Sequence, residues 1–409
     1  MHGELMLKDF CEKTYRKKLI KINDRIYHFY SYGHSNAIAI IGNTSVILID
    51  TLDSDMYAKD LLSDLKTITN HPVKTIIYTH GHPDHRGGSG AFKDTVKEVI
   101  AFTPYKPGLK YFDKINDFLQ QRGQYQHGYG LTDEEAICQG IGIREGKETG
   151  HGQYHFLAPT TLYDEEVVER CIDGVKLRLV RVPGETDDQI FIWLEEDQVI
   201  CTGDNYYGVF PALYAIRGTQ YRDIATWLDS LENILSYPSV ALLPGHTEPI
   251  LGKEKIQEQV GNFKDAIESI FFQTLDCMNR KMTLDETVQN VHLDKKYAQL
   301  PYLKEYYGMV EWAVKSIYNG YVGWFDGNPA NLLPISEKEY YQTLLELIGE
   351  DRLLNKIKTC MQEEQYQLAL QLLEMIENKE LKKECLLQRV KQVTSANARH
   401  YYIACAKQL

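Results

Sequence analysis

The chain has 409 residues, with 57 Asp or Glu against 45 Lys or Arg and a formal net charge of −12. This acidic balance argues against non-specific nucleic-acid binding, which needs basic surface to displace phosphate counterions. No stretch approaches the roughly 20 apolar residues of a membrane helix, and residues 1–21 lack the apolar core of a secretory signal. The eight cysteines are scattered without a CxxC pair, which predicts reduced thiols in a cytoplasmic protein.

The first part of the chain predicts alternating strands and helices. Residues 36–40 and 45–50 are apolar runs joined by a Gly-Asn turn, the signal of a hairpin. Residues 54–70 have apolar side chains at helical spacing, and residues 73–78 are a short β-branched strand. The stretch between Pro104 and Pro159, rich in Gly, Tyr and Gln, has no assigned element, and so long a loop is often functional. Later strands are predicted at residues 175–182, 189–194, 198–202 and 240–243, with a helix at 222–235.

After residue 253 the pattern changes from strands to helices. Leu, Ile, Glu, Lys and Gln recur at i, i+3 and i+4, the spacing of amphipathic helices. A loop at residues 320–334 interrupts this region, and residues 363–378 with 381–393 predict an antiparallel helix pair. We therefore predict an α/β domain at residues 1–253 followed by an all-α domain at residues 254–409.

A cluster of metal-ligating side chains follows the strand at residues 73–78. It reads HGHPDH and places three histidines and one aspartate within six residues. Imidazole and carboxylate are the usual ligands of zinc and of iron or manganese. Residues two apart on an extended segment face the same side, so His80 and His82 suit one ion. Asp84 and His85 then suit a second ion nearby.

Three later strand ends supply candidate remote ligands. Glu185 follows a Val-Pro-Gly turn, Asp204 follows Thr-Gly, and His246 follows Leu-Pro-Gly. Each one alone could be a turn or capping residue, but all three come directly after apolar strands. Structural zinc sites usually have four ligands and are rich in cysteine, so seven ligands without cysteine indicate an open catalytic centre.

This arrangement resembles the metallo-β-lactamase superfamily, whose HxHxDH signature matches residues 80–85. The resemblance implies an αββα sandwich. Over nearly the whole chain the sequence is also similar to the alkylsulfatase branch of that superfamily. The narrower match rests on LYAIRG at residues 213–218, on YRD at 221–223, and on YVGWFDGNPANL at 321–332. The last segment resembles the signature loop of the branch's helical dimerisation domain.

The resemblance implies hydrolysis of alkyl sulfate esters to alcohol and sulfate through a metal-bridging hydroxide. It implies two divalent ions, with Zn²⁺ as the expected metal, and Asp84 is the nearest candidate for managing protons. The ligands carry three negative charges against two dications, which suits an anionic ester substrate. By position, the resemblance assigns His80, His82 and Glu185 to the first ion, Asp84, His85 and His246 to the second, and Asp204 to a bridge between them.

Substrate contacts are also implied by position. Arg217 matches the sulfate-binding arginine of the branch, and an arginine fork reads a tetrahedral oxyanion through two parallel hydrogen bonds. The alternative for Arg217 is a structural ion pair. Tyr125 and His127 fall where relatives contribute a tyrosine to the sulfate pocket, although a tyrosine packed in a loop fits equally. Tyr207, next to Tyr206, follows the bridging aspartate closely and could line the mouth of the pocket.

Four features depart from the branch. Asp204 stands where well-studied members have a bridging glutamate, and Glu185 comes one residue early after its Pro-Gly turn. Ala212 matches an asparagine that helps to hold sulfate. The C-terminal sterol-carrier-like domain of the branch is expected to be missing, because the sequence stops soon after the helical region.

Other functions fit the same metal ligands. A lactonase, thioesterase or phosphodiesterase would share them, because fold and metal centre do not determine the substrate. A non-catalytic, metal-stabilised assembly protein is the least favoured alternative, and a di-iron redox role is disfavoured by the lack of a flavin-binding segment.

By resemblance the helical domain forms a homodimer. Its alternative role is a lid on the α/β domain of the same chain.

Overall fold

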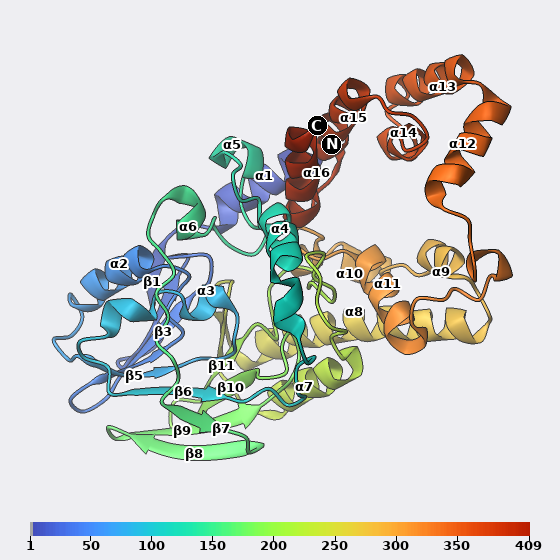
Figure 1. Cartoon of the computed structure of the whole chain (residues 1–409). Coiled ribbons are helices and arrows are strands. Elements are labelled where there is room, and N and C mark those ends of the chain that lie inside the picture. Colours follow the sequence, from blue (N-terminus) through green and yellow to red (C-terminus); the bar gives the residue numbers. More distant parts are fainter. Residues whose placement is uncertain (1–2) are drawn as a thin grey trace.

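The computed structural model describes residues 3–409 and has two facing β-sheets with helices on both outer sides (Figure 1). A seven-stranded sheet runs in chain order from β1 to β7. Its strands are β1 (Lys18–Lys21), β2 (Ile26–Tyr30), β3 (Ala37–Ile41), β4 (Val46–Ile49), β5 (Val73–Ile77), β6 (Glu98–Phe102) and β7 (Thr161–Tyr163). The order in the six-stranded sheet is β13 (Ile250–Leu251), β12 (Ala241–Pro244), β11 (Val199–Gly203), β10 (Ile190–Leu194), β9 (Val175–Arg181) and β8 (Val167–Ile172).

Apolar side chains from both sheets form the central core. Ile47 and Ile49 of β4 share this core with Ile190 and Ile192 of β10, and all four are fully buried. Strands covered on both faces read as continuous apolar runs, which is why β4 and β10 could be predicted from sequence. The αββα sandwich implied by the resemblance is thereby confirmed.

Helices cover the two outer faces. α2 (Asp55–Leu65) packs Leu61 and Leu65 on the first sheet. α7 (Ile224–Ser236) and α8 (Lys253–Asn279) pack Trp227 and Ile267 on the second sheet. α2 begins at a Ser54 N-cap, whose hydroxyl accepts from the Tyr57 backbone N–H, so the predicted helix starts where its capping residue stands.

Four of the strands that the sequence did not reveal, β1, β7, β8 and β13, lie at sheet edges. β8 is a second-sheet edge strand with exposed residues alternating with half-buried ones, and it carries Glu169 and Arg170. An edge strand keeps its charged side chains in water, so it lacks the apolar run on which the prediction depended. The predicted hairpin of β3 and β4 is confirmed, with Ile40 opposite Ile47 in antiparallel register.

The unassigned stretch between Pro104 and Pro159 contains four helical elements. They are η2 (Phe112–Ile115), α4 (Asn116–His127), α5 (Asp133–Ala136) and α6 (Gly146–Thr149). α4 lies along the C-terminal helix α16 (Ala396–Gln408). The buried ring of His400 in α16 lies 3.0 Å from the carbonyl oxygens of Gln126 and Ala136. The end of the chain therefore supports this stretch.

The second half of the chain is helical, as predicted. α11 packs on α8, and the predicted helix pair corresponds to α14 and α15, which contact each other. A separate apolar cluster around Leu353, Ile357 and Leu373 joins the last helices, away from the sheets (Figure 1). The domain boundary at residue 253 stays a prediction. The remaining elements are α9 (Leu284–Asn290), α10 (Lys295–Ala298), η3 (Pro301–Leu303), α11 (Val310–Val322), η4 (Pro329–Asn331), α12 (Glu337–Ile348), α13 (Glu350–Gln362), α14 (Tyr366–Leu373) and α15 (Lys379–Gln392).

The state of two cysteines differs from the prediction. Cys11 of α1 (Gly3–Thr14) is bonded to Cys138, and the remaining six cysteines are free thiols. The prediction of reduced thiols is wrong for this pair, because residues 127 positions apart meet only through the tertiary fold. Across residues 3–409, no helix is long and apolar enough to cross a membrane.

Candidate metal centre

The seven predicted ligands meet at one edge of the sandwich, beyond the ends of strands. β5 leads into His80, β9 into Glu185, β11 into Asp204 and β12 into His246. β4 pairs with β5 and β11 with β12 in parallel, so these strands deliver their C-terminal ends to the same edge. The short helix α3 (Pro83–Arg86) then turns the chain so that Asp84 and His85 face the same point.

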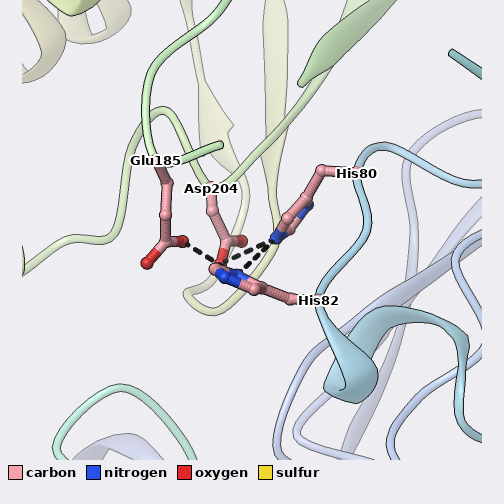
Figure 2. A group of neighbouring side chains, drawn as sticks. All are labelled: His80, His82, Glu185 and Asp204. Carbon is pink, nitrogen blue, oxygen red and sulfur yellow. Dashed lines mark hydrogen bonds and ion pairs between the residues drawn. The ribbon is translucent and has the colours of Figure 1, made fainter. Parts of the chain in front are cut away.

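Four of these side chains point toward one another (Figure 2). His80 Nε2 lies 3.0 Å from His82 Nδ1, which lies 3.6 Å from Glu185 Oε2. Asp204 Oδ2 is 3.8 Å from His80 Nε2. Two donors that bind one zinc ion at about 2.1 Å are at most about 4.2 Å apart. The three distances therefore suit ligands of a common ion.

A second group surrounds the other side of Asp204. Asp84 Oδ2 lies 3.4 Å from both His85 Nε2 and His246 Nε2. These two ring nitrogens are 3.3 Å apart. Asp204 presents Oδ1 at 3.2 Å from the ring of His85 and Oδ2 at 3.0 Å from that of His246. Asp204 thus reaches both groups, as a bridging carboxylate must.

Hydrogen bonds at the back of the histidine rings orient them. Nδ1 of His85 lies 2.8 Å from Asp50 Oδ2, and Nδ1 of His80 lies 3.0 Å from the Thr79 hydroxyl. Nδ1 of His246 lies 3.0 Å from the backbone carbonyl of His34. Each ring therefore turns Nε2 into the cluster, the usual arrangement of a metal-ligating histidine. Asp50 was not predicted, although it stands at a predicted strand end.

The electrostatics of the cluster fit bound cations. Burial alone would lower the pKa of His246, but the carboxylates of Asp204 and Asp84 outweigh it and raise this pKa to about 10. Among residues 3–409, Glu185 Oε2 is buried and has no hydrogen-bond partner. A buried carboxylate oxygen is normally paired or metal-bound. The oxygen and nitrogen donors therefore fit a divalent metal centre.

A cavity of about 400 Å³ opens beside the cluster and includes Asp84, Arg217 and His127 in its lining. Arg217 Nη2 lies 3.4 Å from His82 Nε2, and the Arg217 backbone N–H donates to Gln126 Oε1 at 2.7 Å. Arg217 and His127 thus both line this cavity, and their role as substrate contacts stays a prediction. Arg222 also lines the cavity and was not predicted as a site residue.

Arg222 holds one of the candidate ligands. Its guanidinium lies 2.9 Å from Glu185 Oε1 and donates to the backbone carbonyl of Ala212. Because one carboxylate oxygen of Glu185 is engaged in this way, the other faces His82. The sequence contains Arg222 in the YRD segment, but only the fold brings it against Glu185.

The structure corrects two predicted substrate contacts. Tyr125 is not part of the cavity lining, and its ring packs on Tyr401 with centroids 5.4 Å apart. The reason is helix geometry, since α4 turns the side that carries Tyr125 toward α16, while residues 120, 123, 124, 126 and 127 line the cavity. Tyr207 is fully buried behind the cavity, where its ring contacts those of His246 and Tyr307. Tyr307 lines the cavity instead.

Glu145 is a further cavity residue that was not predicted. Its side chain is 15% exposed and lies 3.8 Å from His127 Nδ1, and the Tyr129 hydroxyl donates to it at 2.6 Å. Burial and the neighbouring Asp53 carboxylate raise the pKa of Glu145 to about 8, against the hydrogen bond from Tyr129. A carboxyl with such a pKa keeps a proton at neutral pH.

Glu145→Gln is expected to remove a pH dependence of stability. A carboxyl whose pKa is raised on folding binds its proton more tightly in the folded state. Its contribution to the free energy of unfolding therefore falls as pH rises from about 4.5 to about 8. Between pH 5 and pH 8 the wild type should lose about 3 kcal/mol more than the variant. Urea unfolding of both proteins at several pH values measures this, and parallel curves would contradict it.

Comparison with known proteins places the chain in a family. Residues 31–246 match the model of the metallo-beta-lactamase superfamily, and residues 283–409 match that of alkyl sulfatase dimerisation. The chain is 34% identical over 313 residues to a linear primary-alkylsulfatase of Pseudomonas sp. (strain ATCC 19151), covering 74% of this chain and 59% of that enzyme. It is 32% identical over 346 residues to an alkyl/aryl-sulfatase of Saccharomyces cerevisiae, covering 81% and 53%.

The fold also matches a solved structure. The sec-alkylsulfatase of Pseudomonas sp. superposes with a TM-score of 0.84 at 24% identity, over 96% of this chain and 65% of the other. The chain thus spans less than two thirds of the length of each of these relatives. The superfamily model covers more than half of the sequence. The protein therefore belongs to the metallo-beta-lactamase superfamily, in the alkylsulfatase-like branch that carries the dimerisation domain.

Proposed function

We propose that the protein hydrolyses alkyl sulfate esters to an alcohol and sulfate at a centre of two zinc ions. The observation that carries this proposal is the position of Arg217, whose guanidinium faces the cavity 3.4 Å from His82 in the metal cluster. An arginine beside a metal centre suits a substrate with a tetrahedral oxyanion. The similarity to two alkylsulfatases over most of the chain supports the same substrate class.

The proposed ligand sets follow the two groups of side chains. The first ion would be held by His80, His82 and Glu185, the second by Asp84, His85 and His246, and Asp204 would bridge them. When bound, two such ions activate a water molecule near neutral pH and polarise the ester. The ligands offer nitrogen and oxygen donors but no sulfur. Such a set is compatible with zinc and with several other divalent metals.

The other side chains would orient the substrate and hold protons. Arg217 would bind the sulfate group and neutralise charge that develops on its oxygens. Burial, with a smaller contribution from nearby Arg222, lowers the pKa of Arg217, yet a guanidinium stays charged in proteins. Arg222 would keep Glu185 in a single orientation through their 2.9 Å contact. Asp50 would hold the His85 ring, with its Nδ1 proton, in place.

Sulfate release from dodecyl sulfate by the zinc-loaded protein tests the proposal. We expect turnover that needs two zinc ions per chain. Ion chromatography of the released sulfate measures it. No release from a protein that binds two ions would reject the sulfatase assignment and favour another ester. A panel of lactones, thioesters and phosphodiesters would then identify the class, because these substrates share the metal centre but not the anion pocket.

We also propose that the chain forms a homodimer through its helical half. In α12 no residue is buried, although the helix carries apolar side chains. The loop before it exposes Leu333 to 91%, and Leu347 near the end of α12 is 78% exposed. A concentration of exposed apolar side chains is typical of an interaction site, and this region lies within the match to the dimerisation model.

The double substitution Leu333→Asp with Leu347→Asp is expected to convert the dimer to a monomer. Charged side chains would have to be buried without partners in the interface. Sedimentation at micromolar concentration measures the change, and Leu5→Asp in α1, also at an exposed position, is the matched control. A wild type that sediments as a monomer would contradict the dimer, as would a double variant that remains dimeric.

A further inference from the structure

His34 lies against the second group of candidate ligands and comes from a different part of the chain. It stands in the turn between β2 and β3 and is 4% exposed. Its Nε2 is 3.8 Å from Asp84 Oδ2, and its ring centroid is 5.0 Å from that of His246. His34, Asp84 and His246 each offer one donor atom within 4.8 Å of the others.

The turn holds the His34 backbone on both sides. The backbone N–H donates to Asp53 Oδ1 at 2.7 Å, and the backbone carbonyl accepts from Nδ1 of His246 at 3.0 Å. His34 therefore already orients one proposed ligand through its main chain. A substitution of its side chain leaves both of these backbone contacts in place, so the side chain can be tested separately.

The His34 ring is in the tautomer that a metal ligand requires. Nδ1 lies 3.0 Å from the backbone carbonyl of Ile143. A carbonyl oxygen only accepts, so Nδ1 carries the proton and the neutral ring presents the lone pair of Nε2 to Asp84. The distance of 3.8 Å to the carboxylate is too long for a hydrogen bond. It is within the limit of about 4.2 Å for two donors on one ion.

The same arrangement recurs in the proposed ligands. His80, His85 and His246 each have Nδ1 beside a hydrogen-bond acceptor and Nε2 turned toward the cluster. A histidine with a purely structural role in this protein looks different, because both ring nitrogens of His400 lie 3.0 Å from backbone carbonyls. His34 follows the first pattern.

We propose that His34 is an additional protein ligand of the second metal ion. This inference rests on the proposed two-metal centre. The second ion would then have five protein donors, from His34, Asp84, His85, His246 and the bridging Asp204. The first ion would have four and lies nearer Arg217, which contacts His82. The first ion would therefore be the more open one, on the side where the sulfate group binds.

His34→Asn tests the role of Nε2. The asparagine amide can still donate to the Ile143 carbonyl, but no atom replaces Nε2. We expect affinity for one of the two zinc equivalents to fall by at least about 10-fold, measured by competition with a chelating dye, while the other stays unchanged. His400→Asn, which also removes a buried histidine, is the matched control and should keep both affinities.

Proton NMR of the cobalt-loaded protein gives a second readout, independent of turnover. A ligating histidine shows a strongly shifted, exchangeable ring N–H resonance, so His34→Asn should lose one such signal. The wild-type protein alone also decides the point, should the variant not fold, because assignment of a shifted signal to the His34 Nδ1 proton establishes ligation.

Three outcomes would overturn the inference. If His34→Asn binds two zinc equivalents with unchanged affinity, Nε2 of His34 is not a ligand. An unshifted His34 N–H signal in the wild type would lead to the same conclusion. Only one ion bound to the wild type would reject the two-metal centre together with the role of His34. Absence of sulfate release from a protein with two bound ions would reject the proposed substrate but leave the His34 inference intact.

Discussion

Asp84→Ala is expected to remove at least one equivalent of metal and to lower the rate of alkyl sulfate hydrolysis by at least about 10³-fold. Asp84 Oδ2 lies 3.4 Å from the ring nitrogens of both His85 and His246, so its loss opens the second group of ligands. It also removes a negative charge beside two histidines. Without that carboxylate, the local field favours a dication less strongly.

The measurement combines metal analysis with sulfate release. Asp94→Ala is the matched control, because Asp94 is an exposed aspartate close in sequence and outside the cluster. It should keep wild-type metal content and rate. Normal metal content and turnover in Asp84→Ala would refute the proposed two-metal centre. Normal metal content with lost turnover would instead assign Asp84 to proton transfer and exclude it as a required ligand.

Arg217→Ala is expected to lower kcat/KM for alkyl sulfates by about 10² to 10³-fold while leaving both metal ions bound. The guanidinium lies at the edge of the cluster and is not among its carboxylate and imidazole donors. Its removal should therefore weaken binding of the anionic substrate and leave metal binding unchanged. Arg217→Lys should recover only part of the loss, since an ammonium keeps the charge but lacks the planar fork.

A neutral ester substrate distinguishes anion recognition from general damage to the site. Hydrolysis of a neutral ester by the zinc-loaded protein should change little in Arg217→Ala. Arg178→Ala, which removes a partly exposed arginine of β9 paired with Glu169, serves as the matched control. An equal loss on the neutral and the anionic substrate would mean that Arg217 supports the structure of the site, and it would remove the main argument for a sulfate ester.

Local sequence was sufficient for the elements that lie in the middle of the fold. β4, β5, β10 and β11 are buried on both faces, so their apolar runs are visible without any knowledge of neighbours. The edge strand β8 has mixed composition because one of its faces stays exposed. The helices between Pro104 and Pro159 depend instead on partners far along the chain. His400 of α16, for example, contacts the carbonyl of Gln126.

The candidate metal ligands could be predicted because they follow strand ends in chain order. The C-terminal ends of neighbouring parallel strands meet at one edge, so a polar residue after each strand is brought to the same point. Roles that depend on the direction of a side chain could not be predicted. Tyr125 lies on the opposite face of α4 from His127 by helical periodicity, although the two are close in sequence.

The sequence by itself therefore determined the fold class, the superfamily resemblance and the seven candidate ligands, because strand periodicity and strand-end motifs are local properties. Only the tertiary structure brought His34, Glu145 and Arg222 to the site. His34 lies in a turn with no metal motif, and Arg222 meets Glu185 from 37 positions away in sequence. Such contacts depend on how separate elements pack, and no spacing along the chain encodes them.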